Sequence, residues 1–207
     1  MLTINLNIIF FLMLNSNFSI KYYLILLYFS DYFDDSDLLI LRKSMQNLKI
    51  FHFIAYDHES AGDANTKNVL TRILPIIGPK LTKLCIICNQ SLDLDAAFKV
   101  IESRQSTMKE LCLICSSLSD DFLKAISRLK ELDLTSVTLF LTKDNKNITN
   151  IGLRELLKSQ RNIRKLHIVS FREISDESLL VISEYLPNIS ILKIMDERKC
   201  FTEVSFL

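Results

Sequence analysis

Residues 108–116 read Met-Lys-Glu-Leu-Cys-Leu-Ile-Cys-Ser, and apolar side chains occupy the first, fourth and sixth positions of this stretch. The same frame recurs along the chain, so an internal repeat is the first property to consider. Clear copies begin at residues 81, 129, 163 and 189, and two weaker copies begin at residues 24 and 48. The steps between successive starts are 24, 33, 27, 21, 34 and 26 residues. Repeats of about this length predict a solenoid of strand-and-helix units.

The frame itself is typical of a short strand that is buried on one face. Side chains alternate between the two faces of a strand, so positions 4 and 6 lie together on the core side. Position 5 then points away from the core. The sequence therefore predicts one strand per repeat, with its outward positions available to a partner.

Between the frames, the chain has the pattern of amphipathic helices. The pattern is clearest over residues 174–187, where a polar cap precedes apolar residues at helical spacing and Pro187 ends the helix. Residues 118–126 and 148–157 repeat the arrangement. The predicted apolar face of the 174–187 helix consists of Leu179, Ile182 and Leu186.

These helix starts share the pattern Ile/Leu, Ser/Thr, Asp/Asn, two residues, apolar, and a lead such as Pro187-Asn188-Ile189 precedes the next frame. The pattern resembles the cysteine-containing leucine-rich repeats of F-box proteins, over about residues 48–194. The resemblance implies an α/β fold: a right-handed solenoid with a parallel sheet on its concave face and helices on its convex face. It also implies substrate recognition for an SCF-type ubiquitin ligase. Where that family has its cysteine, this chain has Asn89, Ser116, Val137 and Phe171.

The predicted organisation is an apolar segment at 1–21 followed by a leucine-rich-repeat domain at 22–207, with about six to seven irregular repeats. The apolar segment fits a signal peptide poorly, because no basic residue precedes Lys21. Polar residues also interrupt any apolar run of the length that a bilayer needs. An edge of the repeat array or an artefact of the gene model is favoured over a signal or membrane anchor.

Composition excludes several classes of function. Lys and Arg total 25 against 24 for Asp and Glu, so nothing indicates a nucleic-acid partner. The chain has 3 glycines, none of them placed to form a phosphate loop, and it lacks hydrolase and metalloprotease signatures. We therefore expect no enzymatic activity and no cofactor. Five cysteines in 207 residues are too sparse for a disulfide-stapled fold, so we expect a reducing cytoplasmic or nuclear location.

Two Cys-x-x-Cys pairs, Cys85 with Cys88 and Cys112 with Cys115, have a spacing that zinc sites use. Both pairs occupy the same positions of adjacent repeats, so repetition alone explains the match. Ile-Ile and Leu-Ile between the cysteines favour a strand rather than the turn that a zinc knuckle needs. We expect structural cysteines and no metal, with Cys85 and Cys112 as neighbours on the sheet about 5 Å apart.

The outward positions of the frames predict a protein-binding surface on the concave face. A stripe of apolar residues beside mixed charges is the composition of a binding surface, although strand-end residues that tuck under the next loop would show the same pattern. Residues 135–147 are predicted to bulge from one rim as a loop. The candidate contact residues are His52, Ile54, Lys83, Cys85, Ile87, Glu110, Cys112, Ile114, Asp133, Thr135, Lys165, His167, Val169 and Lys193.

An F-box is not visible, because the chain has no Trp and its only prolines are Pro75, Pro79 and Pro187. The sequence leaves open whether the box is missing, diverged or cut off. An SCF adaptor is an expected partner only if a box precedes the repeats. The alternatives are a stand-alone or membrane-tethered repeat scaffold and, less favoured, a zinc-binding regulatory protein.

Overall fold

The computed structural model describes residues 8–11, 23–28, 38–39, 42–43, 45–55, 71–88, 94–140, 147–169 and 175–195. Its strands form one sheet in chain order, β1-β2-β3-β4-β5-β6-β7-β8. Strand β1 pairs with β2 in antiparallel orientation, and every later neighbour is parallel. The strands are β1 (Ile8–Phe11), β2 (Tyr23–Tyr28), β3 (Ile50–Ala55), β4 (Lys83–Cys88), β5 (Glu110–Ile114), β6 (Ser136–Phe140), β7 (Lys165–Val169) and β8 (Ile191–Met195).

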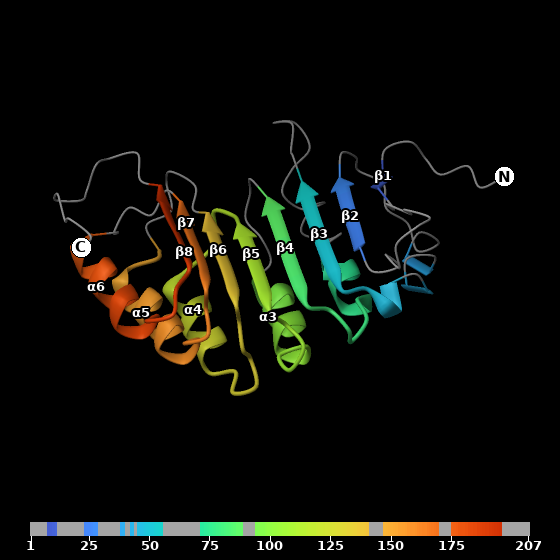
Figure 1. Ribbon diagram of the computed structural model, residues 1–207. Helices are drawn as coiled ribbons and strands as arrows, with labels where there is room; N and C mark the ends of the chain where they lie inside the picture. The colour runs from blue at the N-terminus through green and yellow to red at the C-terminus, as the bar shows by residue number, and fades with distance from the viewer. Residues whose placement is uncertain are drawn as a thin grey trace.

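Helices form a second layer behind this sheet, as Figure 1 shows. One helix follows each of the strands β4 to β7, and short 3₁₀ turns, η1 (Met45–Asn47) and η2 (Leu74–Ile76), precede β3 and β4. Consecutive helices pack side by side, as consecutive strands do. The α/β architecture of the prediction is therefore confirmed. The helices are α3 (Leu94–Ser103), α4 (Asp120–Ser127), α5 (Asn150–Ser159) and α6 (Asp176–Tyr185).

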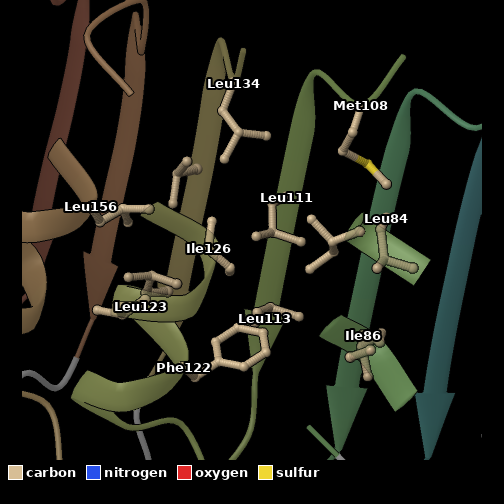
Figure 2. Close-up of a cluster of buried hydrophobic side chains, with 14 of the residues drawn as sticks. Leu84, Ile86, Met108, Leu111, Leu113, Phe122, Leu123, Ile126, Leu134 and Leu156 are labelled. Carbon is tan, nitrogen blue, oxygen red and sulfur yellow. The ribbon is translucent and has the colours of Figure 1, made fainter. Parts of the chain in front are cut away.

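The core lies between the two layers and is built from the inward strand positions. In register, Leu84 of β4 aligns with Leu111 of β5, and Ile86 aligns with Leu113. These four side chains are at most 3% exposed and share one hydrophobic core with apolar residues of the helix layer, such as Phe122, which lies beside Leu113 in Figure 2. Close packing of this kind is the main source of stability in a fold whose repeats contact only their neighbours.

The Ser/Thr-Asp/Asn pairs at the helix starts cap their own helix and also bind the next repeat. Ser119 accepts a hydrogen bond from the Phe122 amide at 3.3 Å and so caps α4. The carboxylate of Asp120 accepts from the backbone amide of Thr149 at 2.8 Å and from its hydroxyl at 2.6 Å. Asn150 makes the corresponding contact by donating from Nδ2 to Ser175 Oγ at 3.4 Å, and its Oδ1 accepts from the Ser178 hydroxyl in the first turn of α6. These pairs thus form a polar ladder across the helix layer.

A second ladder runs along the entry to the strands. The hydroxyls of Thr82, Thr135 and Ser190 donate to the preceding repeat's backbone carbonyl at 3.0, 3.2 and 3.0 Å. Their backbone amides donate to the same carbonyls. Each hydroxyl thereby reinforces the backbone bond that starts strand pairing, so its position marks the strand entry of a repeat.

The prediction for the fifth repeat was wrong by five residues. The frame beginning at Leu129 placed a strand near residues 131–135, whereas β6 is Ser136–Phe140 and turns its Val137 and Leu139 toward the core. Leu129 and Leu132 instead belong to two turns that follow α4, and both side chains are buried. In the first turn, the backbone amide of Leu129 donates to the carbonyl of Ile126 at 3.1 Å. The expected rim loop over 135–147 is accordingly wrong for the residues of β6.

The first repeat also differs from its prediction, by three residues. The frame that begins at Leu24 put Leu27 at inward position 4, but Leu24 itself aligns with Phe51, and Leu27 aligns with Ile54. The run around β2 is apolar at every position, so it carries no alternation that could define the phase. With both corrections, the equivalent residues Leu24, Phe51, Leu84, Leu111, Val137, Leu166 and Leu192 are separated by 27, 33, 27, 26, 29 and 26 residues.

Within the predicted apolar segment 1–21, the structure describes only β1, which pairs with β2 from Ile8 opposite Tyr28 to Phe11 opposite Ile25. In the part of the chain that the structure describes, no helix combines the length and apolar character needed to cross a bilayer. The domain boundary at residue 21 remains a prediction.

Candidate protein-binding face

The face of the sheet opposite the helices presents three rows of side chains, one residue per strand, which together we call the concave face. The strand registers from β3 to β8 define each row. The entry row is Ile50, Lys83, Glu110, Ser136, Lys165 and Ile191. The middle row is His52, Cys85, Cys112, Thr138, His167 and Lys193. The exit row is Ile54, Ile87, Ile114, Phe140, Val169 and Met195.

Twelve of the fourteen candidate residues lie in these rows, as the registers show. Asp133 and Thr135 do not, because β6 begins only at Ser136. Asp133 instead accepts from Lys109 Nζ and from Asn162 Nδ2, both at 2.7 Å, and both partners hold the pKa of its carboxyl below the usual range. Thr135 belongs to the strand-entry ladder.

Sequence reasoning missed the concave residues of β6, which are Ser136, Thr138 and Phe140. A signal was available, because Thr135 occupies the same place before its strand as Thr82 and Ser190. The alternating run that begins at Ser136 also continues directly from it. The register of β6 adds Phe140 to the exit row, where it lies between Ile114 and Val169.

The exit row is apolar on every strand from β3 to β8. Its first five members are half-buried, and Met195 at the end is 64% exposed. Neighbouring strands lie about 4.8 Å apart, so the row extends over roughly 24 Å. A continuous apolar strip of this length on a described surface is a feature of binding sites more than of solvated faces.

Charges divide the concave face into two halves. On β4 and β5, Lys83 Nζ and a Glu110 carboxylate oxygen form an ion pair at 3.0 Å, so this half is nearly neutral. On β6, β7 and β8 no acidic residue occurs, whereas Lys165 and Lys193 are exposed. Burial lowers the pKa of His167 most, and the ammonium groups of Lys193 and Lys165 lower it further. The imidazole is therefore neutral at physiological pH. The C-terminal half of the face is therefore basic through its two lysines.

At the centre of the middle row, the prediction that Cys85 and Cys112 are neighbours is confirmed. The two residues align in register on β4 and β5. The Cys112 thiol lowers the pKa of Cys85 most, burial opposes this effect, and the nearby Lys83 ammonium lowers the pKa further. The interaction with Cys85 raises the pKa of Cys112, and burial raises it further.

Within the described ranges, no group of three or more His, Cys, Asp or Glu residues is arranged to hold a metal ion. The four described cysteines are free thiols. The two members of each Cys-x-x-Cys motif are separated in the sheet, because Cys85 pairs across to Cys112 and Cys88 lies beyond that pair on the buried side.

A hollow of about 430 Å³ opens on the helix side, between η2 and α3. The Ser103 hydroxyl there donates back to its own helix, to Lys99 O at 2.7 Å. The Arg104 guanidinium donates to the carbonyls of Gly78 and Ile77, and so fastens α3 to the preceding turn. Ser103 and Arg104 in this hollow are thus engaged in structural contacts. Its lining is Thr71, Pro75, Asp95, Ala96, Lys99, Val100, Ser103 and Arg104.

Comparison with known proteins supports the fold. No protein-family model matches the sequence, and no curated protein matches it significantly. Among solved structures, the chain is similar to one from the crystal structure of the Rad7 and Elc1 complex in yeast, with a TM-score of 0.62 and 15% identity. The match covers 81% of this chain but 41% of the solved chain, so this chain spans less than half the length of its structural relative. Together with the parallel sheet and alternating helices, this likeness identifies the fold as a leucine-rich-repeat solenoid.

Proposed function

We propose that this chain is a non-catalytic protein-binding module that recognises substrates for an SCF-type ubiquitin ligase. Three features support the proposal: the repeat fold, the helix-start motifs that resemble those of F-box proteins, and the composition of the concave face. The structural relative was crystallised in a complex, Rad7 with Elc1, so a chain of related fold assembles with another protein there. The kind of partner that this chain binds is inferred from the composition of its concave face.

The observation that carries the proposal is the uninterrupted exit row. A catalytic site would need a nucleophile, base or metal held in a cleft, whereas this surface offers apolar area with a polar and charged border. Protein interfaces combine an apolar centre with a polar rim in the same way. The row lies on rigid neighbouring strands, so a partner would meet a preformed surface.

The charges indicate the chemistry of the partner. Among the described strand residues of β6 to β8, Lys165 and Lys193 have no acidic neighbour on the concave face, so a partner segment that brings carboxylates to β7 and β8 would gain steering and specificity. An α-helix rises about 5.4 Å per turn, close to the strand spacing of about 4.8 Å. An acidic amphipathic helix across the strands could therefore place one apolar side chain near each strand.

Affinity purification of the tagged chain from its native cells, followed by mass spectrometry, tests this function. The sharpest variant is Met195→Asp, because Met195 is 64% exposed at the end of the exit row. Its matched control is Leu180→Asp, on the helix side of the same repeat, where Leu180 is 68% exposed. We expect Met195→Asp to lose the partners and Leu180→Asp to retain them.

Recovery of the F-box adaptor and a cullin with the wild-type chain would support the ligase assignment. If reproducible partners are recovered without either protein, the ligase part of the proposal is wrong and the chain is a repeat scaffold. If both variants retain every partner, the concave face is not the binding surface.

A further inference from the structure

The two Cys-x-x-Cys motifs place four thiols in two levels of the sheet. Cys85 and Cys112 lie in the middle row, on the concave face. Cys88 ends β4, and Cys115 follows β5 directly. The charge of Cys88 influences Cys115, so these two thiols are also near each other. The repeated motif therefore forms two cross-strand thiol pairs in different surroundings. We call Cys85 with Cys112 the upper pair and Cys88 with Cys115 the lower pair.

The upper pair has the backbone geometry that a disulfide needs. Cys85 and Cys112 are directly opposite each other on neighbouring parallel strands, which lie about 4.8 Å apart. Disulfides form over Cα separations of about 4.4–6.8 Å, and the spacing of neighbouring strands falls within this range. Their side chains leave the sheet on the same face, and each thiol shifts the pKa of the other, so the two thiols are near each other.

The two pairs differ in their access to solvent. Cys112 is half-buried and Cys85 is 5% exposed, both at the concave face. Cys88 is 2% exposed and Cys115 is fully enclosed. A small oxidant dissolved in water therefore meets the upper pair through Cys112 on the concave face, whereas both thiols of the lower pair are enclosed.

We propose that Cys85 and Cys112 are an oxidisable dithiol site, at which hydrogen peroxide forms a reversible disulfide between β4 and β5, while Cys88 and Cys115 stay reduced. In the first step the thiolate of one cysteine of the pair attacks one peroxide oxygen, the O–O bond breaks, and that cysteine becomes a sulfenic acid with release of hydroxide. In the second step the thiol of the other cysteine attacks this sulfur and displaces a second hydroxide, and the two hydroxides take up the two thiol protons as water. Overall, two thiols and one peroxide give one disulfide and two waters.

The local charges favour one thiolate in this pair. The Cys112 thiol lowers the pKa of Cys85 most, burial opposes this effect, and the Lys83 ammonium lowers the pKa further. The same interaction raises the pKa of Cys112, so the pair ionises to one thiolate beside one thiol. Burial raises the pKa of Cys115 to about 11, so this thiol of the lower pair is protonated at neutral pH. This site does not depend on the identity of any bound partner.

Peptide mapping of the folded, full-length chain after hydrogen peroxide treatment tests the site. Free thiols are blocked with an alkylating reagent before digestion by trypsin, which cuts after Lys and Arg. Trypsin then releases Cys85 and Cys88 in peptide 84–99, and Cys112 and Cys115 in peptide 110–124. Two matched double variants separate the pairs: Cys88→Ala with Cys115→Ala keeps only the upper pair, and Cys85→Ala with Cys112→Ala keeps only the lower one.

We expect the wild type and the upper-pair variant to give the cross-linked peptide, with loss of two hydrogens, and dithiothreitol to reverse it. Fragment ions of the wild-type cross-link should locate the bond between Cys85 and Cys112, which makes the result independent of how well either variant folds. A cross-link through Cys88 and Cys115 would overturn the proposal. So would alkylation of all four thiols after peroxide treatment that fully oxidises a control dithiol peptide.

Discussion

Gly152 lies where the first turns of α4 and α5 approach each other most closely. A Cβ atom built on Gly152 would come within 2.1 Å of a carboxylate oxygen of Asp120 and within 2.8 Å of its Cα. The carboxylate cannot yield, because it already bonds the amide and hydroxyl of Thr149. The glycine therefore serves close packing between repeats.

We predict that Gly152→Ala destabilises the fold by about 1–3 kcal/mol, because the added methyl group overpacks the contact between α4 and α5. In an open helix the same change would stabilise by about 0.5–1 kcal/mol, so the sign of the effect reports on the contact. Urea unfolding measures it. The neighbouring Ile151 is 62% exposed, and Ile151→Ala should change the unfolding free energy by less than about 0.5 kcal/mol.

His52 should make stability depend on pH. Burial lowers its pKa most, and the Lys83 ammonium lowers it further against an opposing effect of Glu110. Below about pH 6.5 the unfolded chain takes up a proton on this residue that the folded chain resists, so stability falls with pH until the folded imidazole is also protonated. We predict that the unfolding free energy decreases from pH 7.5 to pH 5.5, and that His52→Gln reduces this decrease. An equal decrease in both proteins would contradict the role of His52.

The elements of the repeats were predictable to different degrees. Residues 118–126 and 148–157 correspond to α4 and α5 because caps and apolar periodicity are local signals. Strand β6 was misplaced because two frames overlap, one from Leu129 and one from Leu134, and both present apolar residues in the right order. The structure uses the second frame, which leaves a longer connection between α4 and the strand. The length of such a connection depends on the tertiary structure and cannot be predicted from a pattern of nine residues.

The polar ladder between helices offers a test at the scale of elements. We predict that Asp120→Ala destabilises the fold by about 1–3 kcal/mol, because it leaves the Thr149 amide and hydroxyl without their acceptor. The matched control is Asp121→Ala, which removes a carboxylate from the same first turn of α4 but from a side chain that is 95% exposed. Both changes weaken the favourable interaction with the helix dipole equally. Thermal unfolding of the two variants should therefore differ, and equal losses would show that the dipole alone matters.

At the scale of the whole molecule, repetition turns single residues into continuous surfaces. The exit row exists because each strand contributes one apolar residue at the same register, and most of it was predictable from Ile54, Ile87, Ile114 and Val169. The missing member, Phe140, followed from the misplacement of β6. The charge division of the concave face was harder to foresee, because Asp133 had been counted on that face as an acid. Its removal leaves the C-terminal half basic.

That basic half leads to a prediction about association. Once a partner has been recovered, we expect the double variant Lys165→Glu, Lys193→Glu to weaken its binding roughly tenfold or more, mainly through slower association, because charges on an interface rim steer the encounter. The loss should shrink as salt is raised, since screening acts over about 8 Å at physiological ionic strength. Titration by surface plasmon resonance at two salt concentrations measures both effects.

The control for this prediction changes net charge by the same amount at a different place. Lys130 and Lys158 are exposed outside the concave face, Lys130 in the turn after α4 and Lys158 on α5, so Lys130→Glu with Lys158→Glu matches the charge change. If binding depends on the concave face, this control should retain near wild-type association rates. Equal slowing in the two double variants would mean that overall charge governs the encounter, and that the lysines of β7 and β8 do not mark where the partner docks.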